Sequence, residues 1–473
     1  MTDQTGNFND TTMRRDLENI FGVSDRGIRT YFSVTIHNEK EDFSPMKLLT
    51  RQVNRDYYKM TGEAFHVRVL MSAGDYFYRV LPFKENLEIS IYKETLYENG
   101  DINEDNPPKE IRYKALLDLK SNPNMGSDSI ANMRREDVDR IPPFEIVFEM
   151  LDRREEVYRL KSLDGVYSNI TVEEVLKGVV PHEANKVKVD GNPIVQAVHV
   201  DPPKNVTRYP QLHIPSGTLL RDIPGFLQEA SLGVYNAGLG NFFQVYKNKP
   251  TLFVYPLYDT KRFEREGVRL VIYSVPEDKF PSMDKTFRIE GKTIFIASTG
   301  EKKVIEQSRN NDINRGVGFR MSNAESFMTK PVEITDTGIK ASRNRLNIEV
   351  GGYKRKDQTN YAPVVGASSN PFLEYSRFLS GHVDGVSCIW ENSNEDLLYP
   401  GMPVKFIEMD KGIYVERTGT LVKSFTLDAL VGSPMSTEST YSSKTNLTLF
   451  LEQKTNLPDP VEKDTDWENK KLY

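Results

Sequence analysis

Hydrophobic and polar residues alternate with a period of two over long parts of the chain, a pattern that predicts β-strands with one covered face. The alternation is plain from Thr445 to Leu451, where it ends in an apolar run. Pro400-Gly401 predicts a tight turn ahead of another strand, because Pro presets φ and Gly tolerates a positive φ. Further strands are expected over 415–423 and 444–453. These C-terminal residues therefore predict a β-barrel-like unit.

Residues 28–160 show the same alternation and predict a first unit of this kind. The expected strands cover 30–36, 64–71, 76–83, 86–97, 111–119 and 143–151. A turn at 72–75 would join the second and third of them as a hairpin.

The pattern changes between the two β-rich regions. Thr171 followed by Glu174 predicts a capped helix start, and Gly178 predicts its end. A second helix is expected within 218–235, followed by strands at 241–247 and 251–258. This segment predicts a small α+β domain.

Together these patterns predict an α+β, mostly β protein with two similar β-barrel-like domains joined by a small α+β domain. The expected divisions are an N-terminal arm at 1–27, a first barrel-like domain at 28–160, the α+β domain at 161–258, a second barrel-like domain at 259–300 plus 371–456, a polar insertion at 301–370 and a C-terminal arm at 457–473. A short helix is expected over 11–21 in the N-terminal arm and another over 371–380.

Composition narrows the function. The 473 residues carry a net charge of -6, so no basic excess marks the whole chain as a nucleic-acid binder. The single cysteine, Cys388, excludes an intramolecular disulfide and a cysteine zinc site. The polar N-terminus does not resemble a signal peptide, and no apolar run of membrane-spanning length occurs. The chain is therefore expected to fold in a reducing cytosol.

Known catalytic motifs are missing from the sequence. No phosphate-binding glycine loop, G-x-S-x-G elbow or H-E-x-x-H pattern occurs, and none of the six histidines pairs at i, i+4. We therefore expect a protein that is not an enzyme, with no catalytic residue, no cofactor and no metal. Tyr and Phe are abundant instead, at 23 and 24 residues, and such side chains suit strands that meet other subunits. The candidate assembly-interface residues are Phe65, Val67, Tyr76, Tyr78, Tyr399, Met402, Leu447 and Leu449.

The order of three segments resembles the central baseplate hub proteins of contractile phage tails. The segments are Phe65 to Ile91, then Thr171 to Gly178 with Asp222 to Tyr258, then Leu398 to Gln453. The resemblance implies two tube domains per chain and a homotrimeric ring that joins the six-fold tail tube to the central spike. It also implies contacts with the tube protein, the spike protein and other baseplate proteins, with DNA only as passing cargo. The protein would be made in the host cytoplasm and reside in the virion, at the tail baseplate.

Two other functions remain open from the residues. A virion-associated cell-wall hydrolase would need two carboxylates in a cleft. Glu145 and Glu149 share one face of a predicted strand, which we interpret as facing solvent. A tail adaptor or receptor-binding module would need no such pair, and a trimer with a central hole would separate a hub from an adaptor.

Overall fold

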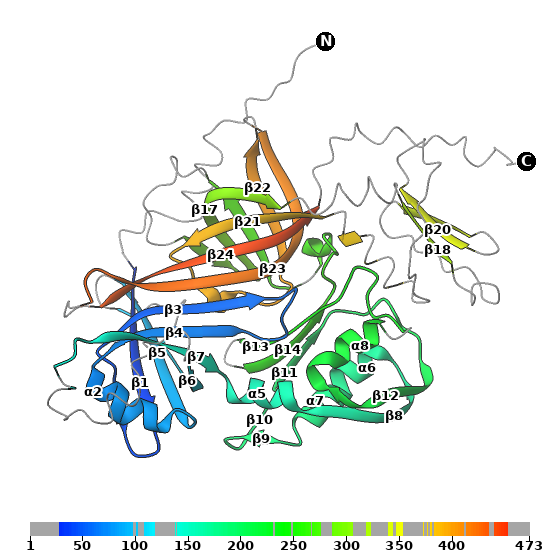
Figure 1. Ribbon diagram of the computed structural model, residues 1–473. Coiled ribbons are helices and arrows are strands. Elements are labelled where there is room, and N and C mark those ends of the chain that lie inside the picture. Colours follow the sequence, from blue (N-terminus) through cyan, green and yellow to red (C-terminus); the bar gives the residue numbers. More distant parts are fainter. Residues whose placement is uncertain are drawn as a thin grey trace, which may run out of the picture.

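A computed structural model shows the mostly β, α+β architecture expected from the sequence (Figure 1). It describes residues 28–452, with longer gaps at 119–137, 276–285, 306–317, 323–338 and 353–371 and shorter ones elsewhere. Fourteen strands join one large sheet; most of the helices gather in one region beside it, while α2 (Ala73–Asp75) lies apart from them. No helix among the described residues is long and apolar enough to cross a membrane.

The large sheet curls into a first closed barrel of eight strands. Going around it, the strands are β3 (Lys47–Asp56), β4 (Ala64–Met71), β7 (Phe144–Leu151), β6 (Lys109–Leu117), β5 (Leu87–Tyr97), β1 (Ile28–His37), β24 (Thr440–Glu452) and β23 (Ile413–Val431). Between β1 and β24 the barrel closes through one residue pair, Thr30 with Tyr441. The two-residue strand β2 (Asp42–Phe43) pairs with the end of β1.

A second closed barrel continues from the same sheet. Its six strands are β15 (Arg269–Ser274), β22 (Pro403–Asp410), β23, β24, β21 (Val383–Glu391) and β17 (Thr293–Ile305), which pairs back onto β15 in parallel. The short strand β16 (Phe287–Glu290) pairs with β17 in antiparallel orientation. Both barrels therefore contain β23 and β24.

Strand β23 passes from one barrel to the other at a bulge. Its first part pairs with β22 as far as Thr420, and its second part pairs with β3 from Lys423 onward. The register of β23 on β24 shifts between Leu421 and Lys423, at the same place. A bulge bends a strand and increases its twist, which lets one strand serve two curved walls.

The third unit is a small α+β domain with its own core. It contains β8 (Ser162–Ile170), α6 (Val172–Glu174), η3 (Val175–Val179), α7 (Val180–Ala184), β11 (Ala197–Val200), β12 (Tyr209–Leu219), η4 (Leu220–Asp222), α8 (Ile223–Glu229), β13 (Gly240–Tyr246) and β14 (Lys249–Tyr255). The hairpin of β9 (Lys188–Val189) and β10 (Asn192–Pro193) projects from it, and α5 (Arg153–Leu160) links it to β7. Thr171 and Glu174 form the expected capping box.

Several shorter elements complete the described residues. These are α2 (Ala73–Asp75), η1 (Tyr76–Val80), η2 (Leu81–Phe83), η5 (Arg262–Glu264), η8 (Glu395–Leu397) and a separate antiparallel sheet of β18 (Gly318–Ser322), β20 (Asn347–Gly352) and β19 (Ile339–Arg343). Each barrel and the α+β domain buries a separate hydrophobic cluster.

Two local expectations are wrong, and one strand was not expected. Residues 76–83 are helical, because Ser72 caps a turn at Asp75 and the apolar side chains then close one end of the first barrel. Helical structure continues past Gly178 through α7, because the buried Val175, Leu176 and Val180 pack into the domain core. Strand β3 was not expected, because charged residues occupy its inward positions.

The expected N-terminal arm, its helix and the C-terminal arm lie outside the described residues. The same is true of most of the polar insertion. Of the helix expected at 371–380, the structure describes Phe372, Ser376, Leu379 and Ser380, and these residues are helical.

Strand β23 pairs so closely with β24 at Gly419 that we expect any side chain at this position to destabilise the fold. A Cβ at this position would lie 2.1 Å from the carbonyl oxygen of Phe450, so Gly419→Ala must push the two strands apart. We expect the urea midpoint of unfolding to fall by an amount that corresponds to about 1–3 kcal/mol. Gly178→Ala is the matched control, since a Cβ there meets no atom within 4 Å and helical Ala is favoured over Gly. Equal midpoints for the two variants would contradict the close strand pairing.

Candidate functional site: the sheet face shared by both barrels

Six neighbouring strands, β21, β24, β23, β3, β4 and β7, present one continuous outer face that spans both barrels. Residues directly opposite one another in antiparallel strands lie on the same side of a sheet, so the register defines this face. Three rows cross it: Ile389, Asn446, Phe425, Asn54 and Ala64; Glu391, Lys444, Leu427, Gln52, His66 and Glu149; Ser442, Ala429, Thr50, Arg68 and Val147. We call these residues the shared face. All of them are at least partly exposed, whereas the residues that alternate with them are mostly buried.

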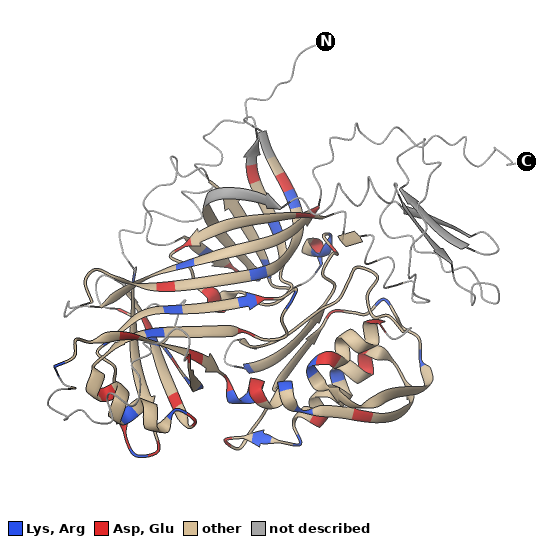
Figure 2. Cartoon of the chain, in the orientation of Figure 1, with Lys and Arg blue, Asp and Glu red and all other residues tan. Residues whose placement is uncertain are grey.

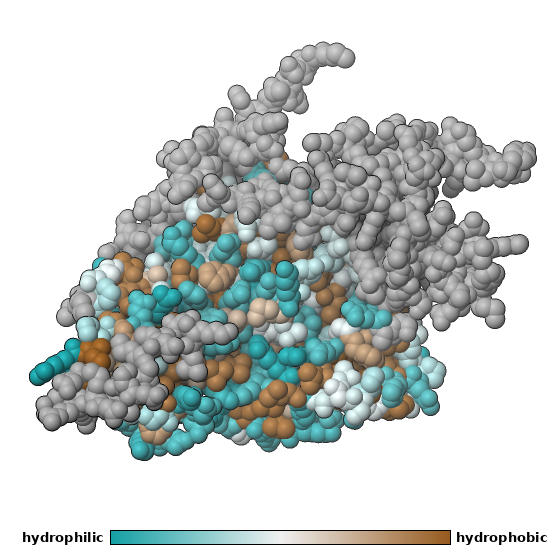
Figure 3. Space-filling view, in the orientation of Figure 1, coloured by the Kyte–Doolittle hydropathy of each residue, from teal (hydrophilic) through white to brown (hydrophobic). Residues whose placement is uncertain are grey.

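The middle of the shared face, between Lys444 and Arg68, is uncharged and mixes polar with apolar side chains, because β23 contributes Phe425, Leu427 and Ala429. Asn54, Gln52 and Thr50 lie on β3, and Asn446 and Ser442 lie on β24. Strands β21, β24, β23, β3 and β4 run side by side across the middle of Figure 1, and Figure 2 shows only scattered charged residues along them. In the space-filling view, hydrophilic and hydrophobic side chains are interspersed over this region (Figure 3).

The cations of the shared face are paired with carboxylates. The Lys444 Nζ lies 2.9 Å from Glu391 Oε1, and the Arg68 Nη1 lies 3.1 Å from Oε2 of Glu145 on β7. Glu149 adds a further negative charge to the same face. Because binding of nucleic acid to a protein surface depends on cations that contact phosphates, this face offers little attraction to a nucleic-acid backbone.

The candidate interface residues lie elsewhere. Seven of the eight side chains are buried in the cores of the chain: Phe65, Val67, Tyr76, Tyr399, Met402, Leu447 and Leu449. Phe65, Val67, Leu447 and Leu449 point inward from strands, Tyr76 lies in the helical turn η1, and Tyr399 and Met402 flank the turn before β22. All seven pack the barrels or their junction with the α+β domain. Tyr78 is 41% exposed, and its contact with another subunit stays a prediction.

The other side of the shared face carries a buried cluster of charges, which we call the junction cluster. Its cations are Arg51, Arg55, Lys93 and Lys109, and its anions are Glu63, Glu395, Asp396 and Asp428. Arg51 lies between two carboxylates, with Nη2 2.8 Å from Glu395 Oε1 and Nη1 2.5 Å from Asp428 Oδ2. The Lys93 Nζ is 3.1 Å from Glu395 Oε2. The shared face is therefore backed by ion pairs as well as by apolar packing.

Glu395 remains ionised despite complete burial. Burial alone would raise the pKa of its carboxyl group, but the positive charges of Lys93, Arg51 and Arg55 outweigh it and hold the pKa well below the usual value. The Lys109 ammonium, 2.8 Å from Asp396, acts in the same way against the burial of that carboxylate and lowers its pKa. Ionised carboxylates held by permanent cations are typical of a structural cluster.

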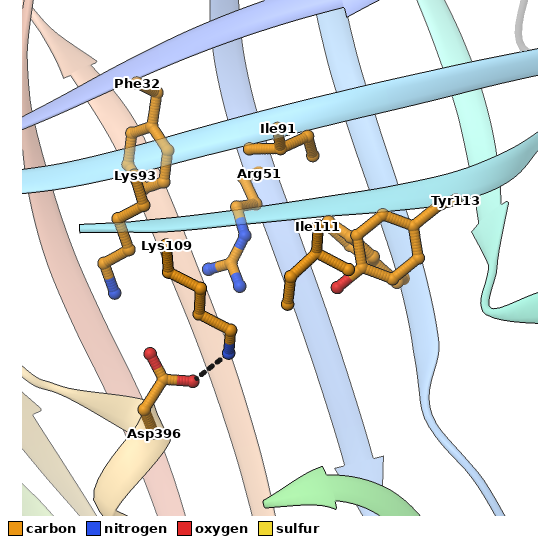
Figure 4. A pocket seen from close by; sticks show the side chains of 9 residues that line it. Phe32, Arg51, Ile91, Lys93, Lys109, Ile111, Tyr113 and Asp396 are labelled. Atoms are coloured by element: carbon orange, nitrogen blue, oxygen red, sulfur yellow. Dashed lines mark hydrogen bonds and ion pairs between the residues drawn. The ribbon is translucent and has the colours of Figure 1, made fainter. Parts of the chain in front are cut away.

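A small cavity beside the junction cluster is too small for a substrate. It measures about 20 Å³, which is room for one water molecule. Arg51, Lys93 and Lys109 line it together with Asp396, and Figure 4 shows the two lysine ammonium groups pointing toward that carboxylate. The remaining lining residues are Phe32, Phe65, Ile91, Ile111 and Tyr113.

The sequence motifs predict that the chain has no catalytic or metal site, and this stays a prediction. In the described part of the chain, no three His, Cys, Asp or Glu side chains come together as a metal site would require. Burial raises the pKa of the Cys388 thiol to about 12, so it is protonated and unreactive near neutral pH.

Sequence reasoning missed both the shared face and the junction cluster. Their common element is β3, where Arg51, Val53 and Arg55 occupy the inward positions and only one of them is apolar. The available signal was the alternation itself: Arg51, Val53 and Arg55 alternate with the neutral polar Gln52 and Asn54. The carboxylates that neutralise Arg51, on Glu395 and Asp428, lie more than 300 residues away in the sequence, whereas Arg55 pairs with the nearby Glu63.

Comparison with known proteins gives matches only at the level of structure. No family model and no curated protein matches the chain. A similar solved structure is the 43 kDa tail protein of prophage MuSo2 from Shewanella oneidensis, with 9% identity over 89% of this chain and 96% of that one and a TM-score of 0.44. Another is the PdpA–VgrG complex of Francisella, with 9% identity over 95% of this chain and 62% of that one and a TM-score of 0.39. A third is the phage P2 baseplate in its activated conformation with Ca, with 10% identity over 90% of this chain and all of that one and a TM-score of 0.28.

These solved structures include a phage tail protein and a phage baseplate, the class that the segment order of the sequence resembles. The TM-scores lie below 0.5 and the identities near 10%. The function proposed below therefore rests on the geometry of this chain.

A second charged group behind the junction cluster predicts a pH dependence of stability. Burial, with a smaller contribution from Glu63, raises the pKa of Glu155 on α5 to about 8, although Arg159 lies against it. Because this folded-state pKa exceeds the ordinary value of 4.5, the group stabilises the fold at low pH and loses that contribution as the pH rises toward 8. We expect Glu155→Gln to remove a slope of about 1.4 kcal/mol per pH unit from the free energy of unfolding between those values.

Urea unfolding at several pH values measures this slope. Glu416→Gln is the control, because Glu416 is exposed and should leave the slope unchanged. A wild-type slope that Glu155→Gln leaves intact would show that Glu155 titrates as an ordinary carboxyl group.

Proposed function

We propose that this chain is a structural subunit of a phage tail baseplate, the hub. Three copies form a ring that joins the six-fold tail tube to the central spike, and the shared face lines the channel through which DNA passes. The observation that carries the proposal is the shared face itself, a continuous neutral wall that crosses two barrels of one chain.

The joining of the barrels supports a role in a ring. Because β23 and β24 belong to both barrels, one chain presents two barrel walls side by side. Three such chains would present six barrels around an axis, which matches the symmetry of a six-fold tube. Closed rings form from heterologous contacts repeated around an axis, so the two lateral ends of each subunit would meet the next copies.

The surface chemistry supports a passage rather than a binding site. A channel wall for a polyanion needs little net positive charge, since cations would hold the cargo. On the shared face Lys444 and Arg68 are already paired with carboxylates. Uncharged side chains lie between them, the apolar Leu427 and Ala429 on β23 and the polar Gln52 and Thr50 on β3.

The proposed partners follow from this role. They are further copies of the chain, the tail tube protein, the central spike protein and other baseplate proteins, and the proposed location is the tail of the virion.

The carboxylates with shifted pKa values give no support to a hydrolase. In the described residues these are Glu155, Glu174, Glu395 and Asp396. The last three are ion-paired with an arginine or a lysine, and the Glu155 carboxyl, whose pKa is raised to about 8, lies against Arg159. A hydrolytic pair would need two carboxyl groups that face a substrate across a cleft.

Oligomeric state and cysteine labelling test the proposal. Mixed with tube and spike proteins, the chain should elute from size exclusion with light scattering at about three times its 54.2 kDa mass or in larger assemblies. A Gln52→Cys variant should react equally with a small maleimide and a polymer-linked maleimide as a free chain. After assembly, its rate with the polymer reagent should fall at least about tenfold, because the channel excludes the polymer.

Lys84→Cys, at an exposed turn of the first barrel, is the control, and Cys388 is buried and should stay unlabelled. A chain that stays monomeric with its partners would refute the ring. An assembly that leaves the labelling of Gln52→Cys unchanged would refute the lumenal position of the shared face.

A further inference from the structure

The turn η8 joins the three units of the chain at one point. It follows β21 of the second barrel, where Asn394 caps it by accepting from the Asp396 backbone N–H. The preceding Ser393 bonds to β24 through its backbone and its hydroxyl. Just after η8, the carbonyl oxygen of Leu398 accepts from Gln244 of the α+β domain. The turn is thus anchored to β24, which both barrels share, and to the α+β domain.

The acidic side chains of η8 reach in the opposite direction, into the first barrel. Glu395 is fully buried, and its two oxygens face Arg51 on β3 and Lys93 on β5. Asp396 pairs with Lys109 on β6. The carbonyl oxygen of Glu395 also lies 3.5 Å from Arg55 Nη1. One short turn from the second barrel therefore contacts three strands of the first.

The charges of the junction cluster balance only with η8 in place. Two of its four cations have partners on their own side, since Arg51 pairs with Asp428 and Arg55 pairs with Glu63. Lys93 depends on Glu395, and Lys109 depends on Asp396. Removing the Glu395 charge would leave Lys93 buried without its counter-ion, which is costly in a protein interior.

We propose that η8 is an electrostatic latch that sets the angle between the two barrels. The barrels are also joined along β23 and β24 and through the loop after β3, where Tyr57 packs among the buried side chains of the second barrel, and the bulge in β23 is the point at which this connection can flex. The charge of Glu395 holds η8 inside the first barrel and suppresses this flexing. Without that charge the turn withdraws, and the barrels move relative to each other while each keeps its fold. This inference concerns the isolated chain and does not depend on the proposed ring.

Spin labels on the two barrels test the latch in the full chain. Lys84→Cys places one label on the first barrel, and Lys292→Cys places another on the turn between β16 and β17 of the second. Pulsed electron resonance should give a single narrow distance distribution for the otherwise native chain. Glu395→Gln should at least double its width or add a second distance, and Glu416→Gln, at an exposed position, should leave it narrow.

A double variant separates the latch from folding. Lys93→Met with Glu395→Gln removes both members of one pair and leaves the remaining cluster charges balanced, so the chain should fold. We expect this variant to show the broad distribution as well. Folding is followed by circular dichroism and by fluorescence of the buried Trp390 in a Trp467→Phe background.

Broadening in the double variant supports the latch even if Glu395→Gln alone fails to fold. A narrow distribution in the folded double variant overturns it, whatever the single variant does.

Discussion

Two strands that belong to two barrels are the constraint on which the rest of this structure depends. Strand β23 has 19 residues and pairs with β22 at one end and with β3 at the other, while β24 accompanies it on the opposite side. A closed barrel leaves few unpaired strand edges. Because the two barrels share β23 and β24, the pair of barrels also leaves few unpaired edges. The outer side of the shared strands then becomes one wall rather than two.

Burial of charge at the junction is the second feature that needs a physical reason. Apolar side chains of similar size would stabilise such a position as well or better, because ions lose their hydration on burial. An ion cluster instead defines one arrangement, since each charge must find its own partner. Arg51, held between Glu395 and Asp428, connects the turn η8 to β23, and the arrangement fixes where the second barrel meets the first. The cluster is thus better suited to specifying geometry than to adding stability.

Much of the fold follows from period-two patterns that the sequence shows openly. Alternation from Thr445 to Leu451 predicts β24, and Thr171 with Glu174 predicts the start of a helix. Strand β3 and the helical turns at 76–83 did not follow, for different reasons. Arg51 points inward because the distant Glu395 and Asp428 neutralise it, and Arg55 points inward beside Glu63, whereas the apolar run at 76–83 suits either a strand or a buried helix.

Contacts between residues far apart in the sequence also explain why most of the candidate interface residues are buried. Aromatic and apolar side chains on strands were expected to meet other subunits, but pairing across the sheet puts Phe65, Leu447 and Leu449 inside the barrels. The shared face consists instead of residues such as Asn54, Gln52 and Asn446, whose common side becomes visible only with the register. The pattern of a single sequence predicts where strands lie, but it does not predict which strands pair with each other.

The most direct test of the account is a cryo-electron microscopy reconstruction of the chain assembled with its tube and spike partners. The account predicts a three-fold ring in which the outer side of β24, β23, β3 and β4 faces the central channel. A ring in which that side faces outward, or is buried between subunits, would contradict it.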